Sequence, residues 1–230
     1  MDYYIIYILI WFVKKRGVCF LPQIYFCNAE KIGYFYDKML MLIPKERAEK
    51  ANKLFKENDR ILSAAAGFMV TEIFGKDAFE KMSYSEHGKP FFEHGKHFSI
   101  SHSGKFAVLA VSEGNIGIDI ETKVSSDERV ARRCFTEEEQ AFAKMSTENF
   151  LRIWTAKEAV LKFLGTGFSF SPSGFSVLPL NEEHLINGEK MRFFCGKIGE
   201  YPFTAAYCED NDEFLIRELI PEDIEKERAL

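Results

Sequence analysis

The alternation of apolar and polar positions is clearest between Leu151 and Leu164, where it predicts a helix. At 3.6 residues per turn, one apolar stripe comprises Ile153, Trp154, Val160, Leu161 and Leu164. Glu158 and Lys162 are four residues apart, so they share a second face of this helix. A lone pair with this spacing is most often an ordinary surface ion pair.

A strand upstream changes the interpretation of that pair. The segment Gly117–Glu121 is apolar except for two carboxylates on alternate residues, Asp119 and Glu121. Because residues i and i+2 of a strand point the same way, both carboxylates face one side. With Glu158 they can converge on one point, with Lys162 a turn away. Oxygen ligands of this kind suit a hard divalent ion such as Mg²⁺.

The same periodicities place the other elements. Helices are expected from Pro44 to Arg60, through Arg60–Val70, from Asp127 to Arg133, and from Thr136 to Met145. Thr136 with Glu139 three residues later is a capping-box pattern. Strands are expected at residues 23–27, 97–101, 106–111, 116–120, 175–177, 190–195, 203–207 and 213–219.

Composition and charge narrow the class of protein. The net charge of −5 argues against a general nucleic-acid binder, so an anionic ligand would need a local basic cluster. The Pro44–Arg60 segment carries such a cluster, with Lys53, Lys56 and Arg60 expected on one helical face. The five cysteines show no CxxC spacing, which favours reduced thiols and a cytoplasmic location.

The first residues form a separate apolar run from Met1 to Val13, followed by three basic residues. The run is shorter than the roughly 20 residues needed to span a bilayer. Its charges follow it, which is the wrong order for a signal peptide. We interpret residues 1–21 as an N-terminal extension or a start site assigned too far upstream, with an interfacial anchor as the alternative.

A short internal similarity suggests a duplicated α+β unit. Residues 60–65 resemble residues 152–157, and each predicted helix is followed by glycine and then strands. The expected division is a first α+β half over residues 22–117 and a second over 118–220. A charged tail occupies residues 221–230. The acids of the predicted strand would then lie where the halves join, and clefts between domains are common ligand sites.

Several motifs together resemble those of the 4′-phosphopantetheinyl transferases, and the length is similar to the Sfp type. The motifs are Gly88–Pro90, Ile100–Gly104, Gly117–Glu121, Phe135–Glu139 and Trp154–Lys162. The resemblance covers about residues 23–207. It implies a pseudo-dimer of two similar α+β halves with coenzyme A in the cleft between them.

The resemblance also implies a reaction and its participants. Such enzymes move the phosphopantetheine arm of coenzyme A onto a serine of an apo acyl or peptidyl carrier protein and release 3′,5′-ADP. Mg²⁺ on the pyrophosphate would be held by Asp119, Glu121 and Glu158. We assign the general base to Glu158, directly or through water, and charge neutralisation on the leaving phosphate to Lys162. Lys157 points about 100° away and has a different role, either phosphate contact or support.

Basic and polar residues in the matching motifs are expected to bind coenzyme A. Ser101 and His102 would contact the nucleotide part, and Lys89 the adenine or a phosphate. Lys45 and Arg60, with Lys50 as second choice, would bind the 3′-phosphate.

Two other functions use the same residues. One is a non-catalytic module that binds a carrier protein or nucleotide, and the other is a Mg²⁺-dependent nucleotide pyrophosphate hydrolase. We expect a cytoplasmic monomer without nucleic-acid partners or stable membrane association. The carrier and its pathway are not readable from the chain.

Overall fold

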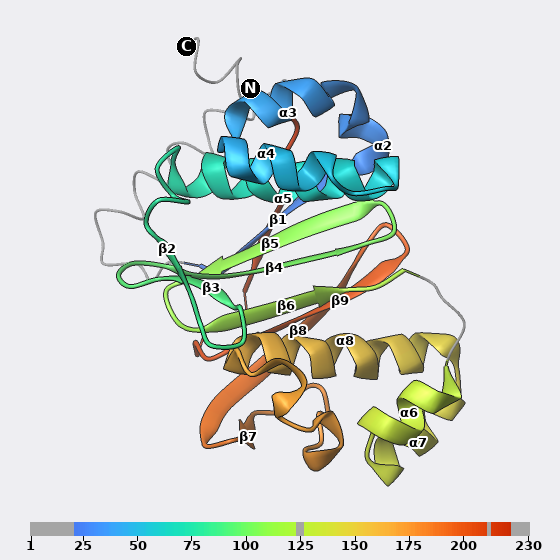
Figure 1. The fold of residues 1–230 in the computed structure, drawn as a ribbon. Helices are drawn as coiled ribbons and strands as arrows, with labels where there is room; N and C mark the ends of the chain where they lie inside the picture. The colour runs from blue at the N-terminus through green and yellow to red at the C-terminus, as the bar shows by residue number, and fades with distance from the viewer. Residues whose placement is uncertain (1–20, 123–126, 211–212, 222–230) are drawn as a thin grey trace, which may run out of the picture.

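Two sheets packed face to face form the centre of the molecule, with a long helix on the outer side of each (Figure 1). The structure is a computed structural model that describes residues 21–122, 127–210 and 213–221. Its layers follow the order helix, sheet, sheet, helix. This arrangement confirms the expected α+β fold of two similar halves.

The first sheet has the strand order β10-β1-β5-β4, in which only the β1–β10 pair is parallel. Its strands are β1 (Gln23–Asn28), β4 (His97–Ser103), β5 (Phe106–Ser112) and β10 (Leu215–Glu218). Its helical side holds α2 (Ala29–Ile32), η1 (Gly33–Phe35), α3 (Tyr36–Leu42), α4 (Lys45–Asn52) and α5 (Glu57–Phe74). A small hairpin of β2 (Met82–Tyr84) and β3 (Pro90–Phe92) follows α5.

The second sheet is antiparallel throughout, in the order β6-β9-β8-β7. Its strands are β6 (Ile116–Ile120), β7 (His184–Ile186), β8 (Glu189–Ile198) and β9 (Tyr201–Tyr207). Its helices are α6 (Glu128–Cys134), α7 (Glu137–Lys144), α8 (Thr147–Leu164), η2 (Gly167–Ser169) and η3 (Pro172–Gly174).

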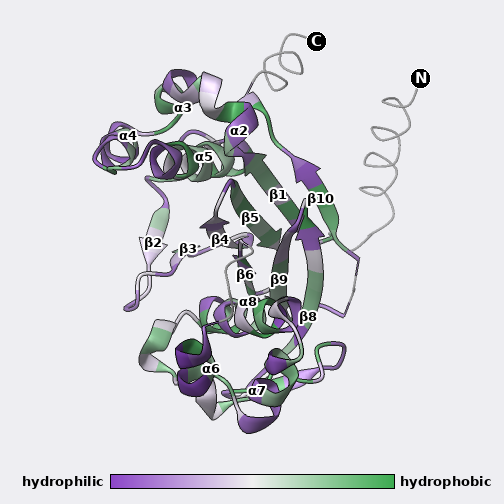
Figure 2. Cartoon of the chain, turned by 90° about the vertical axis from the view of Figure 1, so that its right-hand side faces the viewer, coloured by the Kyte–Doolittle hydropathy of each residue, from purple (hydrophilic) through white to green (hydrophobic). Residues whose placement is uncertain are grey.

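Alternation along β5 explains why the sheets stack. Ala107, Leu109 and Val111 pack against α5. Val108 and Ala110 point the other way, into a core shared with β6 and β9. Every residue of β5 is therefore buried. Figure 2 shows hydrophobic residues concentrated on β1, β5 and β6, with hydrophilic residues on the outer helices α4 and α6.

Gly117 lets α8 lie directly on β6. A Cβ atom there would lie 2.9 Å from Phe163 Cα and closer still to the carbonyl oxygen of Ala159. Only glycine permits so close an approach of helix and strand. Because Asp119 and Glu121 follow Gly117 at alternate positions, they face the same side of the strand as α8.

Serine hydroxyls join the two sheets where β4 runs beside β6. Ser99 Oγ accepts from the Ile118 amide at 3.1 Å, and Ser103 Oγ accepts from the Thr122 amide at 3.1 Å. Ser99, Ser101 and Ser103 alternate along β4, so their hydroxyls all point towards β6. Side chains thus satisfy backbone donors that a regular strand ladder would otherwise pair.

Lys157 supports the fold from a fully buried position. Its ammonium lies 2.8 Å from the Glu139 carboxylate and donates to the carbonyl oxygens of Pro172, at 2.8 Å, and Phe175. Glu139 also completes the expected capping box with Thr136. Of the two roles left open for Lys157, the structure shows support, because its three donors are all used.

Two sequence-based expectations about local structure are wrong. The basic residues Lys53, Lys56 and Arg60 do not share one helix, because residues 53–56 connect α4 to α5. Residues 175–177 form no strand. Side chains bind that segment instead: the Val177 amide donates to Glu139 at 2.7 Å, and the Phe175 carbonyl accepts from Lys157.

The expected division into halves also differs from the observed sheets. The proposed boundary at residues 117/118 falls inside β6. Strand β10, expected in the second half, pairs with β1 in the first sheet. The halves therefore do not separate at one point of the chain. The apolar run Met1–Val13 and residues 222–230 of the tail lie outside the described residues.

The helices and cysteines of the described ranges bear on membrane insertion and on disulfide formation. None of these helices is both long and apolar enough to cross a membrane. Cys27, Cys134, Cys195 and Cys208 are free thiols, and Cys27 and Cys134 are buried.

We predict that Gly117→Ala destabilises the protein by about 3 kcal/mol or more, because the new methyl group would push α8 away from β6. Urea unfolding measures the loss. Gly174→Ala is the control, since its nearest neighbour lies 4.0 Å from the added atom. Equal stability of the two variants would contradict the close approach.

Candidate active site

Asp119 is the most buried acid of the site and joins three elements. Its Oδ1 accepts from Ser101 Oγ on β4 at 2.7 Å and from Lys162 Nζ on α8 at 2.6 Å. Lys162 also donates to Ser101 Oγ at 2.8 Å. Asp119 Oδ2 is buried and has no hydrogen-bond partner among the residues that the structure describes. One oxygen of this carboxylate is therefore held by protein donors and the other is left for a ligand.

Glu121 is held by two donors that the sequence analysis missed. Its Oε2 accepts from Ser103 Oγ at 2.8 Å, and its Oε1 accepts from the Trp154 indole nitrogen at 3.1 Å. Burial and the nearby Asp119 raise the pKa of Glu121. The three groups come from β4, the end of β6, and α8, so the carboxylate has a fixed position.

Glu158 has a strongly raised pKa. Burial, followed by the charge of Asp119, raises its pKa to about 7, and Glu121 acts in the same direction. Lys162 opposes this shift. The three expected acids, Asp119, Glu121 and Glu158, therefore lie close enough for their charges to repel one another.

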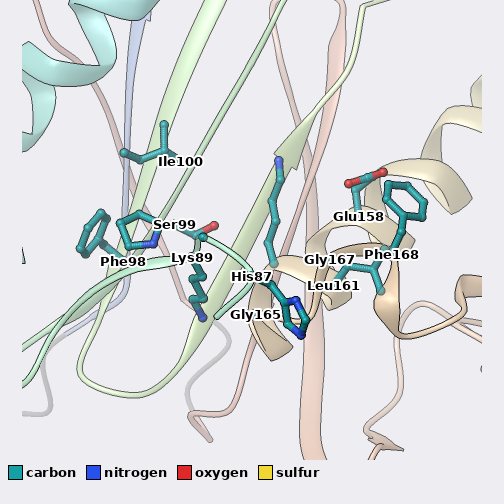
Figure 3. A pocket seen from close by; sticks show the side chains of 13 residues that line it. His87, Lys89, Phe98, Ser99, Ile100, Glu158, Leu161, Gly165, Gly167 and Phe168 are labelled. Atoms are coloured by element: carbon teal, nitrogen blue, oxygen red, sulfur yellow. The ribbon is translucent and has the colours of Figure 1, made fainter. Parts of the chain in front are cut away.

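A cavity of about 300 Å³ lies beside Glu158. Lys162 lines it from the same helix face, as the four-residue spacing predicts. The opposite wall is the turn before β3, which contains Lys89 (Figure 3). Phe168, from the loop after α8, lies near Glu158 at the rim and is 61% exposed. The cavity is large enough for an extended organic ligand to reach the Glu158 carboxylate.

The acids fit a divalent cation in their chemistry. The orphan Oδ2 of Asp119 and the mutual repulsion that raises the pKa of Glu158 are both relieved by a bound cation. Within the described ranges, no group of three or more His, Cys, Asp or Glu side chains is already arranged to hold a metal. In the present arrangement Lys162 donates to Asp119 Oδ1, and Ser103 and Trp154 donate to the two oxygens of Glu121. The assignment of these acids as ligands stays a prediction.

Ser101 and His102, two of the residues expected to bind coenzyme A, lie on β4. Ser101 is buried, and its hydroxyl is engaged with Asp119 and Lys162, so it positions the lysine. Desolvation of the imidazole and, second to it, the charge of Lys162 lower the pKa of His102. The Asn58 amide donates to the Gly104 carbonyl at 2.7 Å and ties the start of α5 to the turn after β4.

The basic residues of α4 and α5 are only loosely held. Arg60 donates to the carbonyls of Leu54 and Phe55 at 3.4 and 3.5 Å. Lys45 is 85% exposed and lies 4.0 Å from Glu49, and Lys50 is exposed on the same helix. Because α5 begins beside the turn after β4, Arg60 and His102 belong to neighbouring elements, whereas Lys45 and Lys50 lie on α4. Anion binding by all of these residues stays a prediction.

Lys89 has a different environment from the one expected. Its ammonium donates to Asn115 Oδ1 at 2.7 Å and to the Phe163 carbonyl at 2.8 Å, and burial lowers its pKa to about 8. These partners belong to the start of β6 and the end of α8. The sequence offered no signal for them, because both acceptors are distant along the chain.

A second hollow lies between α6, Trp154 of α8 and η2. Val130, Cys134 and Phe168 make it largely apolar, and Arg129 and Arg133 supply basic groups. Phe168 lines this hollow and the cavity beside Glu158. The two hollows therefore adjoin along the face of α8 that carries the acid.

Comparison with known proteins finds a family match for the part of the chain that carries these acids. Residues 115–207, from β6 to the end of β9, match the 4′-phosphopantetheinyl transferase superfamily. This range contains Asp119, Glu121, Glu158 and Lys162.

Curated relatives extend the match beyond that range. A 4′-phosphopantetheinyl transferase of Bacillus subtilis is 28% identical over 194 residues, which cover 77% of this chain and 87% of the relative. The 4′-phosphopantetheinyl transferase Sfp of Bacillus subtilis strain 168 is 29% identical over 61% of this chain and 68% of its own. The 4′-phosphopantetheinyl transferase HetI of a Nostoc species is 32% identical over 55% of this chain and 61% of its own. The chain is therefore similar to the 4′-phosphopantetheinyl transferases over the part that carries these acids, and the matches support an enzyme of the Sfp type.

Proposed function

We propose that this enzyme transfers the phosphopantetheine arm of coenzyme A to a serine hydroxyl of an apo carrier protein and releases 3′,5′-ADP. The observation that carries the proposal is the face of α8, where Glu158 and Lys162 line one cavity next to the Asp119 carboxylate. A general base and a cation beside an acid cluster are the groups that phosphoryl transfer requires.

The side chains divide the step between them. Glu158 takes the proton of the carrier serine as the serine oxygen forms its bond to phosphorus and the pyrophosphate P–O bond breaks. A pKa of about 7 suits a base that works near neutral pH. Lys162, held by Asp119 and Ser101, lies where it offsets charge on the departing phosphate.

Asp119, Glu121 and Glu158 would hold Mg²⁺. Bound there, the ion supplies neutralisation of the pyrophosphate charge. The support for this part is the unpartnered Oδ2 of Asp119 together with the raised pKa of Glu158 and Glu121. The crowded acids otherwise destabilise one another.

Coenzyme A and the carrier approach from different sides in this proposal. His102 and Arg60 lie on neighbouring elements suited to the nucleotide phosphates, with Lys45 as a further contact. The arm enters the cavity beside Glu158. The carrier docks over the hollow at Trp154, where Arg129 and Arg133 complement an acidic surface. We place the enzyme in the cytoplasm, where carrier proteins and coenzyme A meet.

Mass spectrometry of an apo carrier panel incubated with the enzyme, coenzyme A and Mg²⁺ tests the function. We predict addition of phosphopantetheine to at least one carrier. Asp119→Ala and Glu158→Ala should each lower the rate by about a hundredfold or more, because each removes a charge used in the transition state. Glu137→Ala, an exposed acid of α7, is the control.

Three outcomes would contradict the proposal or its site assignment. Release of 3′,5′-ADP without any carrier would identify a hydrolase. Binding of carrier or coenzyme A without a mass change in any carrier would identify a non-catalytic module. Transfer that survives both acid substitutions would overturn the site assignment.

The acid cluster also predicts that the ionised Glu158 carboxylate, which the reaction uses, lowers the stability of the metal-free protein. Because the pKa of Glu158 is raised in the folded state, its ionisation costs stability above about pH 7 and nothing below the ordinary value near 4.5. Glu158→Gln should therefore stabilise the metal-free protein on the order of 1–2 kcal/mol at pH 8, allowing for solvent screening, and by much less at pH 4.5. Urea unfolding at both pH values measures this, and an equal effect at both would exclude the proposed charge repulsion.

A further inference from the structure

All hydrogen-bond donors of the Lys89 ammonium are used by acceptors at the start of β6 and the end of α8. Besides its bonds to Asn115 Oδ1 and the Phe163 carbonyl, the ammonium reaches the Ile116 carbonyl at 3.4 Å. An ammonium group has three donors. Lys89 therefore has none left for a phosphate in this arrangement, although its position in the Gly88–Pro90 turn suggested such a contact.

Asn115 closes the same network from the start of β6. Its Nδ2 donates to the Phe163 carbonyl at 2.7 Å, and its Oδ1 accepts from the Ile116 amide at 3.1 Å. Phe163 lies in the last turn of α8, where carbonyl groups lack partners within the helix. A cation at this end is also favoured by the helix dipole. Lys89 and Asn115 together therefore cap α8.

The stem of Lys89 packs on the glycine that ends α8. A Cβ atom at Gly165 would lie 3.0 Å from Lys89 Cδ and 3.4 Å from Lys89 Cβ. Gly165 also has a φ of 67°, which favours glycine. The turn before β3 thus rests directly on the end of the helix that carries Glu158. Turn and helix are two walls of the cavity, and β4 supplies another (Figure 3).

We propose that Lys89 and Asn115 are positioning residues that hold the turn before β3 against the end of α8. They thereby set the shape of the cavity beside Glu158, which the proposed function assigns to the arm of coenzyme A. The two side chains and the Phe163 carbonyl are called the Lys89 clamp. The role differs from a direct contact between Lys89 and coenzyme A. Its kinetic consequence rests on the proposed function, whereas its structural consequence does not.

Kinetics of a double-mutant cycle test the clamp. Lys89→Met should raise KM for coenzyme A about tenfold and change kcat less than twofold, because the cavity widens while Glu158 and Lys162 stay in place. Asn115→Ala should behave similarly, and the double variant should be no worse than Lys89→Met. Lys81→Met, an exposed lysine just before β2, is the control. KM effects that multiply in the double variant would show that Lys89 contacts the donor and would overturn the clamp.

Hydrogen exchange in the full chain without substrate provides an independent test. Amides of Gly165–Gly167 should exchange about tenfold faster in Lys89→Met and in Asn115→Ala than in the wild type or Lys81→Met. Asn115→Ala keeps the ammonium and serves if Lys89→Met does not fold. Unchanged exchange in a folded variant would overturn the clamp. Faster exchange in an enzyme that transfers nothing would support the clamp and refute the proposed function.

Discussion

The contact between Asp119 and Lys162 determines how the site is arranged. It exists because Gly117 lets α8 lie on β6, so that Lys162 reaches an acid two residues further along the strand. Ser101 of β4 bonds to both groups, and therefore this one contact joins both sheets and the helix. Burial of the pair has a desolvation cost that these additional bonds offset.

The same closeness makes the site electrostatically unfavourable without a ligand. Burial and the charges of Asp119 and Glu121 raise the pKa of Glu158, and one buried oxygen of Asp119 has no donor among the described residues. Surrounding elements hold the acids in place nonetheless. Ser103 and Trp154 fix Glu121, and the Lys157–Glu139 pair anchors α8 to α7 and to residues 172–177. Functional sites commonly keep such local cost within a stable scaffold.

Sequence periodicity predicted the parts of the site that depend on local geometry. Strand alternation placed Asp119 and Glu121 on one face, and helical spacing placed Glu158 and Lys162 along one cavity. It could not predict the partners of Lys89 or the pairing of β10 with the first sheet, since those contacts join distant segments. The prediction that Lys53 and Arg60 share one basic helical face was wrong because α4 and α5 are separate helices.

The direct test of the central claim is where a cation binds. Crystals grown with coenzyme A and Mn²⁺ would reveal the ion by anomalous scattering. One peak within coordination distance of the carboxylates of Asp119 and Glu158 is the expected result. A peak remote from both acids, in a crystal that contains bound coenzyme A, would contradict the assignment of these acids to a single ion.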